Sequence, residues 1–359
     1  MTRSLSEVIG GVERQLGNIA RRLSESGHVV TILSSDAEKP KVFYSQLDQF
    51  SIKTYGPNVN DSSSLMVQRV QRQRNIFRLI VREKPDLVIG FMLSGFLAAL
   101  PTSKLVGIPI ILAERNSPDV YNLTRAKKFK NLYFQLMRAS SGITVQLEIY
   151  KSRYPKYLQD RIKVIYNEIL VTPSDLNKKK NSRPFTFGFV GRFSYQKQPI
   201  SLIDSFARHV TEGNDSRLLF IGRGELESEM KKRISDLELG DRVRIMEPLQ
   251  DLDKIYNSLD VLCIPSLWEG FPNVVGEAMR YGIPILGNQN CLGLSELVSP
   301  ETGCLVDFEN EFTDNYESMR IFVSSHDDIS LETARRIEKF QKFDFAQLWD
   351  EVAKSATKR

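Results

Sequence analysis

Residues 260–286 read DVLCIPSLWEGFPNVVGEAMRYGIPIL. The apolar runs at 260–265 and 283–286 are typical of buried parallel strands. Between them, Asn273 is a favourable N-cap and Gly282 a favourable helix stop, so a helix is predicted from about residue 274 to about residue 281. A strand, a loop, a helix and a strand form a βαβ crossover, in which ligands bind where the first strand ends. The stretch therefore predicts a parallel α/β sheet with a ligand site in this loop.

Two glutamates stand at the binding end of this crossover. Glu269 falls in the loop, where it can reach a ligand over the sheet edge, and Glu277 falls on the first or second helical turn, where it can bind a diol. The backbone N–H groups between them form a ready anion site. Acidic residues near helix starts are usually just solvated, because the helix dipole favours them there. The Glu-Gly-Phe-Pro-Asn and Gly-Glu-Ala-Met surroundings favour a binding role instead.

Strand-like apolar runs divide the chain into two α/β halves. They lie at 29–33, 86–90, 108–112, 142–145 and 162–166 in the first half, and at 185–190, 217–221 and 243–245 before the crossover in the second. A polar stretch rich in helix and strand breakers separates the halves. We expect an N-terminal domain at 1–172, a linker at 173–184, a C-terminal domain at 185–342 and a final amphipathic helix within 343–359.

The start of the first half departs from this pattern. Gly10 and Gly11 read like the glycine-rich turn that follows the first strand of such a sheet, but residues 1–9 contain no apolar strand. We therefore expect the N-terminal domain to lack its first strand.

Length and composition narrow the class of protein. At 359 residues the chain is too long for one ordinary core, so two domains are expected. No apolar run is long enough to cross a membrane, and no secretory signal is visible. Cys263, Cys291 and Cys304 have neither zinc-ligand nor disulfide-framework spacing. These features predict a reduced, cytoplasmic protein.

Positive charge is concentrated in the first half. Residues 1–180 carry a net charge of +13 and the remainder −8, within an overall +5. Two basic stretches, 69–84 and 125–138, interleave cations with apolar and aromatic side chains. Such stretches suit an anionic membrane surface or an anionic acceptor, and equally a solvated helix that packs its apolar stripe inward. No nucleic-acid recognition motif accompanies them, so nucleic acid is not expected as a partner.

Two cations follow the strand at 185–190. Arg192 and Lys197 lie on the loop between this strand and a helix that starts near Pro199. Fixed cations stabilise the negative charge that develops on a diphosphate leaving group, and they do so without a metal ion.

Other motifs are weaker. Gly222-x-Gly224 follows a strand, but Glu227 replaces the third glycine of a dinucleotide-binding oxidoreductase. Asp251-x-Asp253 could bind a metal, but it reads better as a helix start with an aspartate N-cap. The three histidines have no metal-ligand spacing, and none is a credible general base. His28 follows a helix-ending glycine, and His209 and His326 stand in polar helix or loop contexts.

A polar triplet follows the strand at 108–112 in the first half. Glu114, Arg115 and Asn116 come at the carboxyl end of a predicted parallel strand, where polar side chains face a ligand crevice. They are the candidates for acceptor contacts.

Five motifs of this chain resemble, in order and spacing, those of the retaining glycosyltransferases of family 4. They are Gly10-Gly11, Gly191-Arg192 to Lys197, Gly222-x-Gly224, Glu269 to Glu277 and the following Gly293-Leu294-Ser295-Glu296-Leu297. The resemblance covers nearly the whole chain and is strongest from about residue 185 to about residue 310. It departs from the family in having Gln198-Pro199 after the lysine and no histidine in the loop at 91–95.

The resemblance implies the GT-B fold, two Rossmann-like domains facing across a cleft, with the last helix returning to the first domain. It implies a donor site in which Arg192 and Lys197 hold the pyrophosphate, Glu277 binds the ribose, and Glu269 with the backbone at Phe271, Asn273 and Val274 holds the sugar. Gly10, Gly11, Gly222 and Leu249 would complete this site, with Glu269, Arg192 and Lys197 as the catalytic residues.

The implied reaction is transfer with retention, without metal or cofactor, of a hexose or N-acetylhexosamine from a nucleotide-sugar, with a UDP-sugar favoured. The acceptor would be a lipid-linked or surface-polysaccharide glycan at the inner face of a bacterial membrane. Three alternatives remain at this point: a non-catalytic or impaired nucleotide-sugar-binding protein, an epimerase of the same fold, and a nucleic-acid binder. The epimerase would need acid and base side chains that the sequence does not offer.

Overall fold

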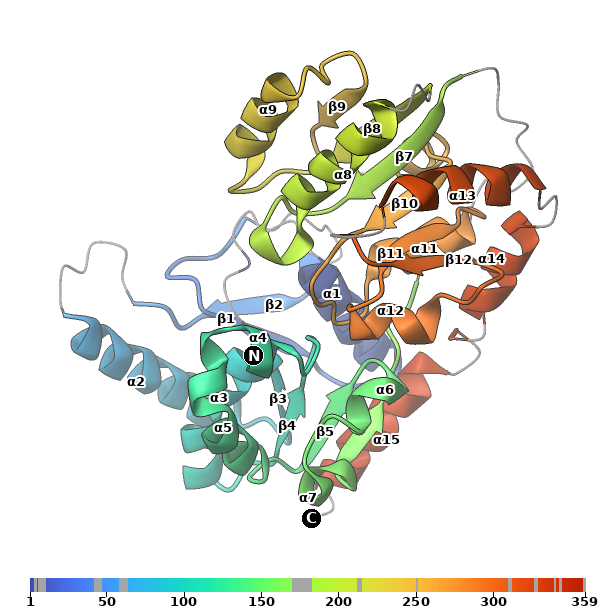
Figure 1. The fold of residues 1–359 in the computed structure, drawn as a ribbon. Coiled ribbons are helices and arrows are strands. Elements are labelled where there is room, and N and C mark those ends of the chain that lie inside the picture. Colours follow the sequence, from blue (N-terminus) through green and yellow to red (C-terminus); the bar gives the residue numbers. More distant parts are fainter. Residues whose placement is uncertain are drawn as a thin grey trace. The chain divides into compact units, whose positions relative to one another are not determined.

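The chain folds into two compact units (Figure 1). Unit 1 comprises Met1–Glu168 with Phe343–Arg359, and unit 2 comprises Ile169–Lys342. The computed structural model describes residues 1–2, 5, 11–41, 47–57, 64–169, 183–211, 215–249, 251–308, 312–325, 329–338, 340–341 and 344–357. Nearly all of the predicted linker, 173–184, lies outside these residues, and so does Gly10.

Unit 2 is built on one parallel sheet in the order β12-β11-β10-β7-β8-β9. The strands are β7 (Phe185–Val190), β8 (Ser216–Ile221), β9 (Val243–Met246), β10 (Val261–Ile264), β11 (Ile285–Asn288) and β12 (Gly303–Val306). The chain runs outward from β7 to β9, returns to pair β10 with β7, and runs outward again to β12. This is the doubly wound order of a Rossmann-like domain, and its switch point lies between β7 and β10.

Helices connect these strands, and two more follow the last strand. They are α8 (Pro199–Thr211), α9 (Glu227–Asp236), α10 (Leu252–Tyr256), α11 (Asn273–Arg280), α12 (Leu292–Leu297), α13 (Phe312–Ser325) and α14 (Ile329–Glu338). The predicted crossover is confirmed as β10, α11 and β11, although α11 begins at Asn273 itself, one residue earlier than expected. Asp251 caps α10 by accepting from the Lys254 N–H at 3.1 Å, as the sequence predicts.

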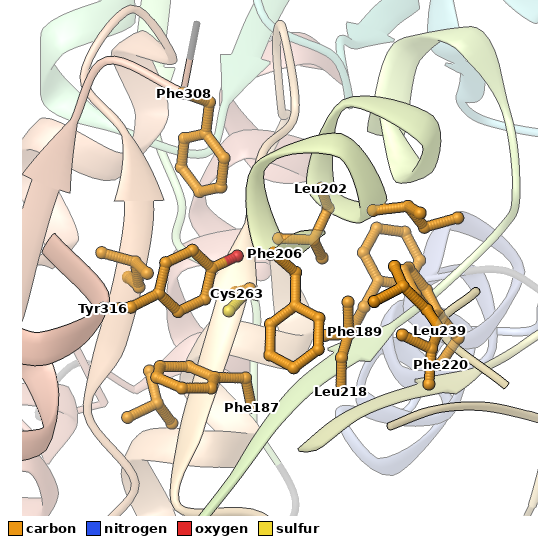
Figure 2. Close-up of a cluster of buried hydrophobic side chains, with 14 of the residues drawn as sticks. Phe187, Phe189, Leu202, Phe206, Leu218, Phe220, Leu239, Cys263, Phe308 and Tyr316 are labelled. Atoms are coloured by element: carbon orange, nitrogen blue, oxygen red, sulfur yellow. The ribbon is translucent and has the colours of Figure 1, made fainter. Parts of the chain in front are cut away.

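Aromatic side chains fill the core of unit 2. Figure 2 shows Phe187 of β7, Phe206 of α8 and Tyr316 of α13 in one cluster, and the rings of Phe187 and Tyr316 meet edge to face with centroids 4.5 Å apart. His209 of α8 belongs to the same core: it is fully buried and stacks on Tyr316 with centroids 4.8 Å apart. The prediction of a polar setting for His209 was therefore wrong, because the histidine faces the apolar stripe of its helix.

Unit 1 has a four-stranded parallel sheet in the order β3-β4-β5-β6 and a two-stranded parallel sheet, β1-β2. The strands are β1 (Thr31–Ser34), β2 (Ser51–Thr54), β3 (Val88–Phe91), β4 (Ile110–Ala113), β5 (Gly142–Val145) and β6 (Ile162–Val164). The prediction of a loop at 91–95 was wrong, because α3 begins at Met92, directly after β3.

The helices of unit 1 are α1 (Gly11–Glu25), α2 (Leu65–Glu83), α3 (Met92–Leu105), α4 (Val120–Leu123), α5 (Lys130–Met137), α6 (Glu148–Lys151), α7 (Lys156–Gln159) and α15 (Phe345–Thr357). A short 3₁₀ helix, Arg125–Phe129, precedes α5. Trp349 and Phe345 of α15 pack with Leu16 and Ile19 of α1 in the core of this unit.

Two residues stand between the two sheets of unit 1. The Met1 ammonium donates to the Ile89 carbonyl at 2.6 Å, and the Met1 carbonyl accepts from Phe91 N–H at 2.8 Å. On the other side, Thr2 N–H donates to the Leu33 carbonyl at 2.9 Å. Within the described residues no strand ladder joins β1 to β3, and these bonds link them instead.

Candidate active site

Three loops of unit 2 meet at the switch point of its sheet. They follow β7, β8 and β10, whose carboxyl ends lie at the same edge. Gly191 N–H donates to Ile221 O, and Phe193 N–H donates to Arg223 O, each at 3.0 Å. These bonds fix the loop after β7 against the loop after β8.

Glycine is required where these two loops touch. A Cβ at Gly222 would lie 1.9 Å from the Gly191 carbonyl oxygen, and one at Gly224 would lie 2.3 Å from the Phe193 carbonyl oxygen. Both obstacles are backbone atoms and cannot move aside like the end of a side chain. The Gly-x-Gly pattern therefore serves close packing of the two loops.

Gln196 fixes the loop after β7 to the loop after β10. Its carbonyl accepts from Leu267 N–H at 2.9 Å, and its side-chain amide donates to the Trp268 carbonyl at 2.7 Å. These bonds bring together Lys197, which follows Gln196, and Glu269, which follows Trp268.

Lys197 and Glu269 form an ion pair across the switch point. The Lys197 Nζ to Glu269 Oε1 distance is 2.5 Å, and their side chains are 20% and 7% exposed. An ammonium has three N–H donors, so one bond to Glu269 leaves two that can reach an anionic ligand. Arg192 lies on the same loop with its side chain exposed. The site thus has a fixed carboxylate and two cations at the end of β7 and β10.

Glu277 lies one helical turn inside α11 and is buried. The Tyr256 hydroxyl of α10 donates to Glu277 Oε2 at 2.7 Å, which fixes one oxygen and with it the orientation of the other. The Tyr256 ring stacks on Tyr281, with centroids 5.1 Å apart, and the Tyr281 hydroxyl donates to Asp253 Oδ1 at 2.7 Å. The position of Glu277 is therefore stabilised by Tyr256, whose ring is in turn stabilised by stacking on Tyr281.

Apart from Gly10 and Gly11, the other predicted donor residues also lie in unit 2. Phe271 and Asn273 are buried, Val274 is half-buried at the start of α11, and half-buried Leu249 follows β9. Sequence reasoning missed Gln196 and Tyr256, whose partners are distant in sequence. It also missed that Cys291 belongs here: burial raises the pKa of its thiol, and the charges of Glu269 and Lys197 act on it. Nothing in the sequence pairs these residues.

The predicted acceptor triplet lies at the end of β4 in unit 1. Glu114 is buried, accepts from the Tyr121 hydroxyl at 2.5 Å, and burial raises its pKa to about 7. Burial lowers the pKa of Arg115 to about 9, and its guanidinium lies 5.7 Å from the ring centroids of both Phe91 and Trp349. Within the described residues no hydrogen bond reaches its nitrogens.

Asn116 is the half-exposed member of the triplet, and its side-chain oxygen accepts from Ser117 N–H at 3.0 Å. Gly11 forms the first residue of α1 and is exposed.

Two absences concern the residues that the structure describes. Among them no group of three or more histidine, cysteine, aspartate or glutamate side chains is placed to hold a metal ion. No described helix combines the length and apolar content needed to cross a membrane.

Two protein-family models match the chain. The model "Glycosyltransferase Family 4" matches residues 9–169, and "Glycosyl transferases group 1" matches residues 173–327. Together they span most of the chain and follow the division into two units. Each half of the chain thus matches the model of a glycosyltransferase family, and the fold of the chain is GT-B. The prediction of two Rossmann-like domains is confirmed.

The characterised relatives that this chain resembles are distant. An Escherichia coli UDP-Gal:alpha-D-GlcNAc-diphosphoundecaprenol alpha-1,3-galactosyltransferase is 26% identical over 62% of this chain and 63% of its own length, which is less than two thirds. A Campylobacter jejuni alpha-1,4-N-acetyl-D-galactosaminyltransferase, named for an undecaprenol-diphosphate-linked glycan, is 22% identical over 84% of this chain and 82% of its own. Among solved structures, Anabaena Alr3699/HepE with UDP and glucose superimposes with a TM-score of 0.78 at 18% identity, covering 98% of this chain and 97% of that one.

Proposed function

We propose that this chain transfers a hexose or N-acetylhexosamine from a nucleotide-sugar, a UDP-sugar before others, with retention of anomeric configuration and without a metal ion. The acceptor is a lipid-linked or polysaccharide glycan. The observation that carries the proposal is the Lys197–Glu269 pair at the switch point of unit 2. This is where a doubly wound sheet binds a nucleotide.

Each role in the proposal is the one that the family resemblance implies, and the position of the residue in unit 2 supports it. Arg192 and Lys197 bind the donor pyrophosphate and stabilise the charge that it gains as the bond breaks. Glu269, with the start of α11 at Asn273 and Val274, holds the transferred sugar. Glu277, oriented by Tyr256, takes the ribose hydroxyls.

The bond changes balance without a protein base. The bond from sugar C1 to the β-phosphate oxygen breaks, and a bond from C1 to the acceptor hydroxyl oxygen forms on the same face of the ring. The acceptor proton passes to the leaving phosphate, so the products are a glycoside and a nucleoside diphosphate. Two cations serve the leaving group as a divalent metal does in other transferases.

The names of the relatives support the donor and acceptor classes. The Escherichia coli relative is named for UDP-Gal and a diphosphoundecaprenol acceptor, and the Anabaena structure contains UDP and glucose. For this chain we propose that Glu114, Arg115 and Asn116 form the acceptor side, with half-exposed Asn116 in contact and the other two supporting its loop. We also propose that the basic first half meets the inner face of an anionic membrane.

A thermal-shift series with UDP-, GDP- and ADP-sugars, each with and without EDTA, tests the donor. A ligand that binds the folded state raises its melting temperature. A shift with UDP-sugars alone that EDTA leaves unchanged is expected. A shift that EDTA abolishes would contradict metal independence, and no shift with any donor would contradict the donor site itself.

Lys197→Ala tests the leaving-group role. We expect kcat to fall by about 10²–10³ with a smaller change in KM, because the ammonium acts mainly on developing charge. Lys254→Ala, which removes an exposed lysine elsewhere in unit 2, is the control. If donor binds but neither protein releases nucleoside diphosphate with any glycan acceptor, the chain is a nucleotide-sugar-binding protein. NMR of the product's anomeric proton tests retention.

A further inference from the structure

Helix α2 is anchored to unit 1 by one face. Ile76 and Ile80 on that face are buried. The Gln73 side chain donates to the Ala98 carbonyl of α3 at 3.2 Å, and the Asn75 side chain donates to the Gly56 carbonyl at 3.4 Å. Figure 1 shows α2 beside α3 at the edge of unit 1. These contacts fix which side of the helix points outward.

One exposed flank of α2, next to the anchored face, is also apolar. At the 3.6-residue helical period, Met66, Val70, Phe77 and Val81 fall on one stripe, about a quarter turn around the helix from Ile76 and Ile80. Their exposed fractions are 76%, 61%, 39% and 42%, and Leu65 and Val67 beside them are exposed as well. Single exposed apolar residues are ordinary, whereas a continuous stripe of them marks an interaction surface.

Arg74 and Arg78 border this stripe at the helical period. All five arginines of the helix are exposed, and they are Arg69, Arg72, Arg74, Arg78 and Arg82. The one acidic residue of α2, Glu83, is its last residue and is paired with Lys53 and Arg82. The outer surface is therefore both apolar and strongly cationic.

The combination of apolar and cationic side chains indicates which kind of partner docks on this surface. A second copy of the chain docked on the same stripe would place two sets of arginines together, which is electrostatically unfavourable. An anionic bilayer instead pairs the arginines with lipid phosphates and accepts the apolar side chains at the boundary of headgroup and acyl chain. We propose that the outer face of α2 docks on an anionic lipid surface and inserts Met66, Val70, Phe77 and Val81 into it. The inference deepens the proposed membrane contact and rests on it.

Vesicle sedimentation tests the docking. The full chain is mixed with sucrose-loaded vesicles of phosphatidylcholine alone, or of equal parts phosphatidylcholine and phosphatidylglycerol. We expect binding to the anionic vesicles, with a partition coefficient lowered about 30-fold by Arg74→Gln with Arg78→Gln, since two phosphate-pairing charges are lost. Val70→Ser with Phe77→Ser is expected to weaken binding at least as much.

Matched controls come from unit 2. Lys231→Gln with Arg335→Gln removes the same charge, and Ile321→Ser with Leu331→Ser removes two exposed apolar residues. Both control pairs should leave vesicle binding unchanged. The UDP thermal shift, which reads the site in unit 2, should be the same in all these proteins, and this verifies folding. Because the UDP thermal shift is measured separately from vesicle binding, a failure of the donor proposal is distinguishable from a failure of the docking proposal.

The insertion of the α2 stripe into the bilayer is measured by a separate experiment. Phe77→Trp places a reporter on the stripe, and we expect its fluorescence to shift to the blue with anionic vesicles but not with neutral ones. Equal binding to both vesicle types, or equal loss in control and α2 variants, would overturn the proposal. So would a dimer in sedimentation velocity that Val70→Ser with Phe77→Ser dissociates, since the stripe would then join two copies.

Discussion

Tyr256 is a positioning residue for Glu277 in the donor site. Its hydroxyl, at 2.7 Å from Glu277 Oε2, is buried, and its ring is held by Tyr281. A buried hydrogen bond to a carboxylate is worth more than an average one, because it is charge-assisted. The orientation of Glu277 should therefore depend on this one hydroxyl.

Tyr256→Phe should weaken the affinity for UDP about tenfold, since it removes a hydrogen bond to a charged group. The affinity for 2′-deoxy-UDP should change much less, because a ligand that lacks the hydroxyl gains little from an oriented Glu277. Calorimetric titration of both nucleotides measures the difference, with Tyr281→Phe as the control that keeps the Tyr256 hydroxyl. An equal loss for the two nucleotides would mean that Tyr256 has a structural role only.

Helix α8 carries a buried histidine whose protonation opposes folding. His209 packs against Phe187 and Tyr316, and its Nε2 lies 3.2 Å from Ser216 Oγ. Burial, and in second place the charge of Arg320, lowers the pKa of His209 to about 4 from an ordinary 6.5. Below pH 6.5 the unfolded chain takes up a proton that the folded chain does not. The stability that the neutral imidazole contributes is thus lost as the pH falls from 6.5 toward 4.

The acid sensitivity of unit 2 should therefore diminish in His209→Gln. Between pH 7 and pH 5, the free energy of unfolding of the wild type should fall by about 2 kcal/mol more than that of the variant. Urea denaturation at several pH values, followed by near-UV circular dichroism, measures both slopes. Parallel slopes would show that other groups cause the acid destabilisation.

The element boundaries show which local signals are reliable. The strands at 142–145 and 185–190 have the predicted bounds, since continuous apolar runs between breakers identify buried parallel strands. β2, with the sequence SIKT, is half-exposed and was not predicted, because it lacks such a run. α3 is apolar on nearly all sides and starts without a polar N-cap, so its first turn was read as a loop.

At the scale of the molecule, the end of the chain completes the first unit. α15 packs its Trp349 and Phe345 against α1, and Trp349 also covers the guanidinium of Arg115. The core of unit 1 therefore depends on a segment that the chain supplies after all of unit 2. Removing the contact between α15 and α1 should therefore lower the stability of unit 1 selectively.

Trp349→Ala should destabilise unit 1 by about 3–5 kcal/mol, because it leaves a large cavity in a core. Unit 2 does not contain this residue, so UDP should still raise the melting temperature of a second transition. Differential scanning calorimetry resolves the two, with Gln347→Ala on the exposed side of α15 as the control. Loss of the UDP-dependent transition in Trp349→Ala would show that unit 2 cannot fold without an intact unit 1.

The sequence by itself determined the parallel α/β organisation and the residues at the switch point. Lys197 and Glu269 could be predicted as site residues because each lies in the loop after a buried strand, and the carboxyl ends of parallel strands share one edge. Their contact also depends on strand order, because β10 lies beside β7 in the sheet.

Only the tertiary structure decided how side chains far apart in sequence meet. Gln196 and Tyr256 are unremarkable in sequence, and their importance comes from partners on other elements. Arg115 follows a strand as predicted, but its burial under Trp349 depends on where α15 packs. The same holds for α2, whose apolar residues span a wide arc of the helix: periodicity cannot say which part of the arc faces the core, because that depends on the surface against which the helix packs.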